Sequence, residues 1–249
     1  MNKENWSLSR LYDLAERCDR KHIYTYSDFL SQADLSDYLE KEREFSYVHP
    51  MIFGGMEDAE RVMIRFGSEE LLGYAEEFPI ATLKIAPLQS KFADAFTHRD
   101  FLGALMHLGI EREVLGDIVL LEDSAFLFCK ESMAEFIMES LTKVKHTSVR
   151  VTREPLPELA KKEPVRMQVQ VASERLDALI AKVFRLSREQ ASSQIKAGRV
   201  FVNGRVTESQ STALKAGDLV TLRGYGRFRF LQVIGESKKG KLNVIVEFG

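Results

Sequence analysis

The stretch from Ser187 to Gly204 limits the possible folds of this chain more than any other, because it contains both ends of a helix and a tight turn. It reads SREQASSQIKAGRVFVNG. Ser187 and Gln190 form an S-x-x-Q capping box, which predicts the first turn of a helix, and Gly198 is suited to the position just past the helix end. Asn203-Gly204, between two short β-type runs, predicts a two-residue hairpin turn. We therefore expect a helix followed directly by an antiparallel hairpin.

Another helix is predicted just before this stretch, and further strands just after it. Apolar residues recur there at the i, i+3, i+4, i+7 and i+8 spacing of a buried helix face, at Leu176, Leu179, Ile180, Val183 and Phe184. Downstream, AGDLVTLRG predicts a strand, RGYGRFRF brings three arginines close together, and a last hairpin is expected around SKKGK. Residues 166–249 thus predict a small domain of two helices and several hairpins.

Charge is distributed unevenly along the chain. From Val165 to the end there are 15 Lys and Arg against 7 Asp and Glu, a net of +8, whereas the preceding 164 residues carry 20 against 30, a net of −10. Arg188, Ser192 and Lys196 share one face of the predicted helix because they are four residues apart, and Arg199 follows just past its end. The helix N-terminus adds a partial positive charge beside Arg188. A basic module on an acidic body is typical of a protein that binds a phosphate backbone.

Residues 76–153 predict a second domain. The order of its elements is strand, helix, strand, strand, helix, strand, which is the ferredoxin-like plan that RNA-recognition motifs also use. None of the predicted strands carries the aromatic pattern by which such motifs stack bases, so the sequence leaves RNA binding by this domain open. The predicted elements are a strand at 80–86, a helix capped by Thr97 and ended by Gly109, strands at 116–121 and 124–130, an amphipathic helix at 131–144 with Phe136, Ile137, Leu141 and Val144 on its apolar side, and a strand at 146–152.

The remaining parts of the chain are an α-rich start and a linker. Apolar residues recur at helical spacing within residues 6–20, LSDYLEKERE adds a short helical piece, and VMIRF predicts a short strand. REPLPELAKKEPV has three prolines and mixed charges, typical of an extended linker. The expected fold class is α+β, with three small domains: an α-rich N-terminal domain (1–75), an RRM-like βαββαβ central domain (76–153) and, after the linker (154–165), a C-terminal domain with β-hairpins (166–249).

The C-terminal unit resembles the S4 domain, an RNA-binding unit named after a ribosomal protein. The resemblance rests on R-L-D in the first helix, S-R-x-x-A-x-x-x-I at the second, then G-x-V-x-V-N-G and a later G-D, and covers about 60 residues. It implies an S4-type αL RNA-binding domain whose second helix and following loop lie along a structured RNA. Asp177 of R-L-D is expected to orient Arg175, and Asn203 to serve the turn first. The candidate RNA-binding residues are Arg175, Ser187, Arg188, Ser192, Gln194, Lys196, Arg199, Asn203, Arg205 and Arg227.

Three classes of enzyme that carry S4 domains are not supported. A pseudouridine synthase would need a G-R-L-D motif on a large β domain, a haemolysin-like methyltransferase a Gly-rich cofactor loop, and a tyrosyl-transfer-RNA synthetase HIGH-like and KMSKS-like signatures. R-L-D occurs once, inside the S4-like unit, and the other signatures are absent. His98 and Asp100 are interpreted as part of a helix start, and Cys18 and Cys129 as small core residues. We expect no catalysis, no metal and no cofactor.

The layout as a whole resembles the YlmH family of bacterial proteins. Two stretches are similar to characteristic stretches of that family, FGGMEDAER in the N-terminal domain and THRDFLGALMHLGIEREVLGDI in the central domain. The resemblance implies a role in ribosome-associated quality control, with the S4 domain against ribosomal RNA of the large subunit and a tRNA or peptidyl-tRNA. A ribosome-assembly factor that binds immature ribosomal RNA, or an RNA-modifying enzyme with an unrecognised active site, are the alternatives. We expect a cytoplasmic protein, monomeric off the ribosome and without a membrane partner, since the apolar runs are too short to span a bilayer.

Overall fold

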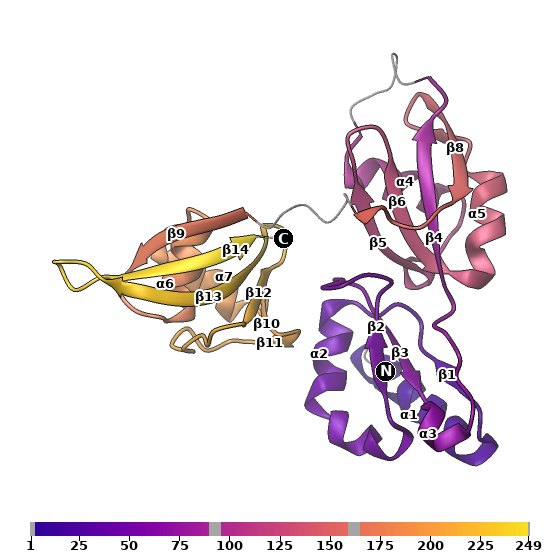
Figure 1. The fold of residues 1–249 in the computed structure, drawn as a ribbon, viewed down its shortest axis with the longest axis horizontal. Coiled ribbons are helices and arrows are strands. Elements are labelled where there is room, and N and C mark those ends of the chain that lie inside the picture. The colour runs from indigo at the N-terminus through magenta and orange to yellow at the C-terminus, as the bar shows by residue number, and fades with distance from the viewer. Residues whose placement is uncertain (1–2, 90–95, 159–164, 249) are drawn as a thin grey trace. The chain divides into compact units, whose positions relative to one another are not determined.

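The structure is a computed structural model that describes residues 3–89, 96–158 and 165–248 and divides into two compact units (Figure 1). The first unit is Met1–Asp34 with Lys41–Ala160, and the second is Leu35–Glu40 with Lys161–Gly249. Helices and antiparallel sheets occur in both, which confirms the α+β class. The predicted boundary at residues 75 and 76 falls inside the first unit and stays a prediction. Residues 159–164 of the predicted linker lie outside the described residues.

The first part of the chain combines a long helix with a small sheet. The elements are α1 (Lys3–Lys21), β1 (Thr25–Tyr26), α2 (Gln32–Glu40), the 3-10 helix η1 (Glu42–Val48), β2 (Met51–Phe53), β3 (Met63–Phe66) and α3 (Glu69–Leu72). The sheet order is β1-β3-β2, with antiparallel pairing throughout. Leu11, Ala15 and Cys18 of α1 are buried, as their helical spacing predicts. No helix within the described ranges is both long enough and apolar enough to cross a bilayer.

The central region has the predicted ferredoxin-like plan. Its elements are β4 (Ile80–Pro87), α4 (His98–His107), η3 (Arg112–Val114), β5 (Leu115–Leu120), β6 (Ala125–Lys130), η4 (Glu131–Met133), α5 (Ala134–Ser140), β7 (Lys143–Val144) and β8 (Thr147–Arg153). The strands form one antiparallel sheet in the order β5-β6-β4-β8-β7. The first strand therefore lies between the third and the last main strand, which is the order that the split βαβ motif requires.

The helix predicted at 131–144 is wrong in its extent. It begins with η4, α5 ends at Ser140, and Val144 belongs to β7 instead. Lys143 and Val144 pair with β8 in a short hairpin, so their backbone groups are used in the sheet rather than in another helical turn. Phe136 is also not on the apolar side of the helix, because 44% of it is exposed.

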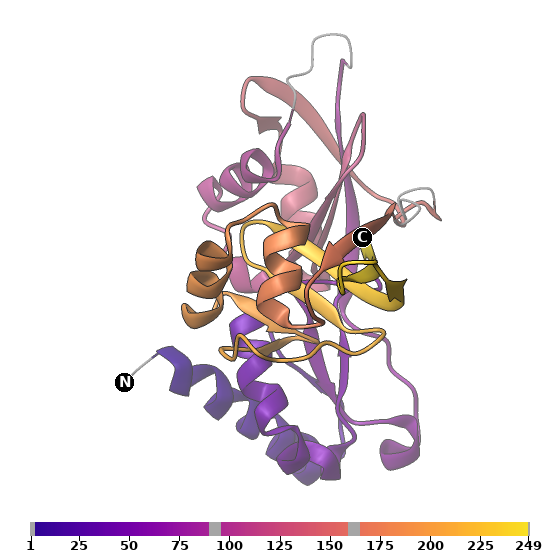
Figure 2. The same ribbon diagram turned by 90° about the vertical axis from the view of Figure 1, so that its left-hand side faces the viewer.

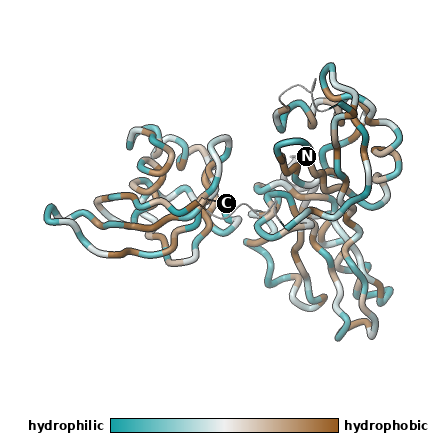
Figure 3. Tube along the Cα trace, turned by 45° about the horizontal axis from the view of Figure 1, so that its top comes forward, coloured by the Kyte–Doolittle hydropathy of each residue, from teal (hydrophilic) through white to brown (hydrophobic). Residues whose placement is uncertain are grey.

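In the second unit, two helices cover one face of a six-stranded sheet. Its elements are β9 (Val165–Val171), α6 (Leu176–Val183), α7 (Arg188–Lys196), β10 (Val200–Val202), β11 (Arg205–Val206), β12 (Leu219–Leu222), β13 (Gly226–Glu236) and β14 (Leu242–Phe248). The sheet order is β11-β10-β12-β13-β14-β9. Figure 2 shows α6 and α7 side by side, and they share one core with the sheet. The tip of the β13–β14 hairpin is hydrophilic, as Figure 3 shows.

The turn of the β10–β11 hairpin is as predicted, but strand β9 was not predicted at all. Asn203 and Gly204 have φ values of 51° and 79°, the left-handed pair that a two-residue hairpin turn requires. β9 pairs with β14 over its whole length, from Val165 opposite Phe248 to Val171 opposite Leu242. The sequence prediction ended the linker at 165 and placed no strand between it and the helix that begins near Leu176.

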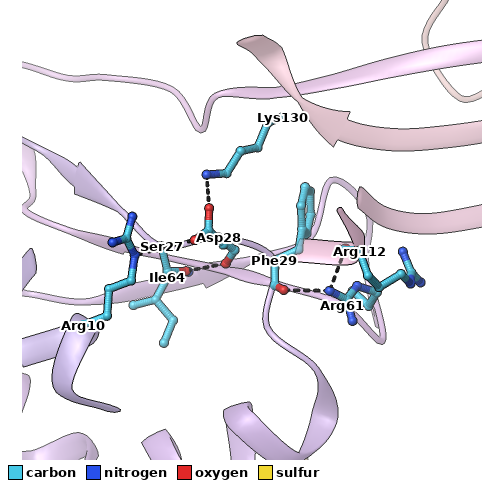
Figure 4. A network of polar contacts seen from close by, with 8 residues as sticks. All are labelled: Arg10, Ser27, Asp28, Phe29, Arg61, Ile64, Arg112 and Lys130. Atoms are coloured by element: carbon cyan, nitrogen blue, oxygen red, sulfur yellow. Dashed lines mark hydrogen bonds and ion pairs between the residues drawn. The ribbon is translucent and has the colours of Figure 1, made fainter. Parts of the chain in front are cut away.

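A polar joint fixes the N-terminal part of the first unit to the central sheet (Figure 4). The half-buried Arg61 donates from Nε to the carbonyl of Leu115 at 2.8 Å and from Nη2 to the carbonyl of Phe29 at 2.7 Å. Asp117 in turn accepts from the backbone N–H groups of Glu60 at 2.7 Å and Arg61 at 3.2 Å. Burial is the main cause that lowers the pKa of Arg61 to about 10. FGGMEDAER and the GDI that ends the second characteristic stretch therefore meet here.

Two glycines allow close packing at the same joint. A Cβ on Gly55, whose φ is 95°, would lie 2.3 Å from the ring of Phe128, and one on Gly116 would lie 2.8 Å from the ring of Phe29. Phe29, Phe128 and Met63 form a buried apolar cluster there. On the other side of the cluster, Asp28 pairs with Lys130 of β6 and, at 3.6 Å, with Arg10 of α1 (Figure 4). The two characteristic stretches therefore build a joint inside the first unit.

Candidate nucleic-acid interface

The predicted RNA-facing helix is α7, and its start is the predicted capping box. The Ser187 hydroxyl accepts from the Gln190 N–H at 3.1 Å, and the Gln190 side-chain carbonyl accepts from the Ser187 N–H at 2.8 Å. Ala191 and Ile195 are fully buried in the core of the unit. Because one face of α7 is buried in this way, the side chains on the opposite face are directed to solvent.

A buried carboxylate holds two exposed arginines where α6 and α7 begin. The Asp177 side chain is 5% exposed and accepts from Arg175 Nε at 3.1 Å and Arg175 Nη2 at 3.3 Å. The same carboxylate lies 3.7 Å from Nη1 of Arg188. The two arginine side chains remain 45% and 57% exposed. Asp177 thus orients both guanidinium groups while its own charge is kept away from solvent, as expected for Arg175 and unexpected for Arg188.

The cations continue to the end of α7 and onto the sheet. Lys196 and Arg199 are exposed, and Arg199 donates to the Gln194 side-chain carbonyl at 3.4 Å. The Arg199 carbonyl accepts from the N–H of Arg223 at 3.0 Å, which brings a further exposed arginine next to this end of the helix. Ser192, half-buried on the same helix, donates to the side chain of Gln210 at 3.2 Å. The structure therefore brings most of the predicted set onto one helix and its C-terminal end.

The hairpin residues of the predicted set have structural partners. Asn203 donates to the Asp218 carboxylate at 2.8 Å and accepts from the N–H of Leu219 at 2.9 Å, so its side chain joins the hairpin turn to the neighbouring strand. Within the second unit, Arg205 donates to the carbonyl of Leu39. Arg227 is half-buried on β13, opposite a residue of β12. The side chains of Asn203 and Arg205 serve the fold first, and the RNA contacts of all three residues stay a prediction.

One exposed aromatic residue was absent from the predicted set. Tyr225 is 50% exposed between Gly224 and Gly226, whose φ values of 87° and 121° form the tight turn that presents it. Its ring packs on that of Phe184, with the two centroids 6.1 Å apart. An exposed aromatic ring beside cations can stack an RNA base. The signal was available in the sequence, as a tyrosine between two glycines of the arginine-rich RGYGRFRF.

One aromatic residue on the face of the central sheet that could stack bases, Phe128, is covered. Leu127 and Cys129 of β6 point into the core beneath the helices, so Phe128 between them points to the opposite face. That face is the one by which RNA-recognition motifs stack bases. Here Phe128 is only 1% exposed, because the N-terminal part of the first unit covers it. Phe128 therefore cannot stack an RNA base in this conformation. Whether the central domain binds RNA through other residues stays open.

Asp100, Cys18 and Cys129, the residues of the first unit that the sequence analysis considered for chemistry, lie in a helix cap or in the core. Asp100 accepts from both the N–H and the hydroxyl of Thr97 at 2.7 Å and pairs with Lys145 at 2.9 Å. These hydrogen bonds, that of the Thr97 hydroxyl first, lower the pKa of Asp100 to about 2. Cys18 and Cys129 are both buried, and burial raises the pKa of Cys129 to about 12. Across residues 3–89, 96–158 and 165–248, no three His, Cys, Asp or Glu side chains form a group that could hold a metal ion.

Comparison with known proteins matches an RNA-binding family model to each of two regions of the chain. The family model described as "Putative RNA-binding domain in YlmH" matches residues 74–158, and the S4 domain model matches residues 174–220. The chain is 32% identical over 200 residues to the ribosome-associated protein quality control protein P2 of Bacillus subtilis (strain 168). The aligned region covers 78% of this chain and 76% of that protein. A solved structure, the cell division protein ylmH from Streptococcus pneumoniae, is similar in fold, with a TM-score of 0.51 at 15% identity over 62% of this chain and 93% of the other.

Proposed function

Because this chain belongs to the YlmH family of S4-domain RNA-binding proteins, we propose that it acts in ribosome-associated quality control by binding ribosomal RNA of the large subunit and a tRNA or peptidyl-tRNA. It acts by binding and not by catalysis. The Bacillus relative is named for ribosome-associated quality control, and that name supports the same setting for this chain. The family resemblance supports the large subunit and a tRNA as the RNA partners.

The observation that carries the proposal is the cationic face of α7. Asp177 holds Arg175 and Arg188 at the start of the helices, and Lys196 and Arg199 continue the row at the end of α7. Lysine and arginine side chains at such a spacing neutralise phosphates and release counterions, which makes binding strong and dependent on salt. The module with this face carries a net charge of +8 within a chain whose overall charge is −2.

The test is density-gradient sedimentation of the tagged full chain from a lysate, with sequencing of the RNA in its fractions. The informative variant is Lys196→Glu/Arg199→Glu, because neither residue contacts the buried Asp177 carboxylate and the fold should persist. The matched control is Lys21→Glu/Lys143→Glu, which changes the net charge equally at exposed positions of the first unit. The RNA-facing variant should move to the top of the gradient, whereas the control should sediment as the wild type does.

The RNA that accompanies the protein decides between the proposed settings. Mature large-subunit RNA together with tRNA supports the quality-control role. Precursor ribosomal RNA without tRNA would replace it with the assembly role. Wild-type protein that stays at the top of the gradient without RNA would contradict both, and sedimentation of the RNA-facing variant with ribosomal particles would contradict the assignment to α7.

A further inference from the structure

A shallow cavity of about 270 Å³ lies in the second unit beside the start of α7. Its floor is apolar and includes Ala178, Ala181 and Leu186, of which the two alanines are buried residues of α6. Lys182 and Arg188 form part of its lining, and Lys241 adds a third cation from the tip of the β13–β14 hairpin. Its described lining contains no carboxylate, so the cavity is positively charged.

The cavity is not explained by contacts to a paired RNA backbone. A duplex presents phosphates and sugars on its outside, and these can reach the exposed cations but not an apolar floor. The volume is just below the range of about 300–1,000 Å³ that encloses drug-sized ligands, so the cavity has room for one ring system. Apolar floor, cationic rim and this size together fit a flat heterocycle attached to a phosphate.

We infer that this cavity, formed by α6, the start of α7, β9 and the β13–β14 hairpin, binds one unpaired nucleotide of the target RNA. The base lies on the alanines of α6, where an unstacked base regains apolar contact. The Arg188 guanidinium, already held by Asp177, packs against the base or its phosphate, since guanidinium planes stack on unstacked bases. Lys182 and Lys241 neutralise the adjoining phosphates.

Gln170 of β9 also belongs to the lining, but its side chain lies on the other face of the sheet. Val169 and Val171 are buried under α6, so Gln170 between them points away from that core, and its amide donates to the Asn243 side-chain carbonyl at 3.1 Å. The Gln170 amide therefore does not read the edge of the base. The inference rests on the proposed RNA binding and adds to it that the target contains a bulged or looped-out nucleotide.

The test uses three RNA hairpins of one sequence with the full chain, by fluorescence anisotropy at low salt. The first stem is fully paired, the second carries one bulged adenosine, and the third carries an abasic bulge, which has the same backbone without the base. Wild type should bind the adenosine bulge about fivefold to tenfold more tightly than the other two, near the lower end of what a base stacked on protein contributes.

The matched substitutions are Ala172→Trp, which fills the cavity from an exposed position in its lining, and Ala216→Trp, at an exposed alanine outside it. Ala172→Trp should remove the preference for the bulge and leave binding of the paired stem within about twofold of wild type. Ala216→Trp should keep the preference. Ala181→Leu, which fills the cavity from its floor, gives a second, independent variant.

The outcomes separate this inference from the proposed function. Equal binding of the three hairpins by wild type overturns the nucleotide site and leaves RNA binding by α7 in place. A bulge preference that survives in both Ala172→Trp and Ala181→Leu places the base elsewhere and also overturns it. Binding of none of the hairpins at low salt overturns both.

Discussion

Replacing Asp177 by Asn tests whether the RNA-facing arginines are positioned or merely present. Asn has nearly the same shape, so the core around the side chain, which is only 5% exposed, should be preserved. The change removes a negative charge and raises the net charge of the module from +8 to +9. Bulk electrostatics alone would therefore make RNA binding tighter. Loss of the contacts to Arg175 and Arg188 would make it weaker, so the sign of the change distinguishes the two effects.

The magnitudes favour weaker binding. Without Asp177, the two arginine side chains are free in the unbound protein and must be ordered when RNA binds. This ordering costs about 0.5–1.5 kcal/mol of binding free energy for each side chain. Removing the Asp177 charge strengthens RNA binding by less than about 1 kcal/mol. The interaction between this position and an RNA phosphate is weakened by the water and salt that lie between them. The net expectation is a loss of about 1 kcal/mol, or about fivefold in affinity. The second unit should also lose about 1 kcal/mol of stability, since both arginines are half exposed and their hydrogen bonds are screened.

The assay is fluorescence anisotropy with the bulged hairpin at several salt concentrations, and thermal unfolding confirms that the variants are folded. Glu189→Gln is the matched control, because it removes one negative charge from an exposed position on α7 next to Arg188. The control should bind as tightly as wild type or more tightly. If Asp177→Asn behaves as Glu189→Gln does, positioning contributes nothing and the argument from the buried carboxylate is refuted.

Three further predictions concern other parts of the chain. Arg61→Ala should lower the free energy of unfolding of the first unit by about 2–4 kcal/mol, because it removes the donor to the carbonyl of the buried Phe29 and the hydrogen bonds that join the two parts of the unit; a shift in urea denaturation below about 0.5 kcal/mol would contradict the joint. Tyr225→Ala should weaken binding of single-stranded RNA about fivefold, whereas Tyr225→Phe should retain it; equal loss in both variants, measured by anisotropy, would exclude stacking. The Asp100 carboxyl should titrate in NMR with a pKa of about 2 in the folded protein, below its ordinary 3.8. The stability that this carboxylate contributes to the fold is therefore present above about pH 4 and is lost as the pH falls toward 2. A titration midpoint at the ordinary value would show that the helix cap is not formed in solution.

Features set by neighbours in the sequence were predictable. The capping box at Ser187, the turn at Asn203-Gly204 and the order of elements in the central domain all depend on residues within a few positions of one another, and the structure confirms them. The expectation that Asp177 orients Arg175 also concerned residues two apart, and the contact is present at 3.1 Å.

Features set by distant pairing were not predictable in the same way. The amphipathic pattern at 131–144 continues beyond the real helix, which ends where a short hairpin with β8 takes over the backbone groups. The alternation of Val169 and Val171 with glutamines at 168 and 170 was a strand signal, but three prolines just before it made the region look like linker only. The approach of Arg188 to Asp177 depends on how α6 and α7 pack, which no local pattern specifies.

The pairing of β9 with β14 has a mechanical consequence. Val165, where the second unit resumes after the linker region, lies opposite Phe248 at the other end of that unit's sequence. Tension applied between these two points would load an antiparallel pair from one end, so its hydrogen bonds would break one after another rather than together. Residues 165–248 should therefore yield at low force when pulled through these ends. Because Val165 and Phe248 are neighbours in the sheet, residues 165–248 are also suited to insertion into another protein. Both ends could be joined to one loop of the host without distorting the sheet.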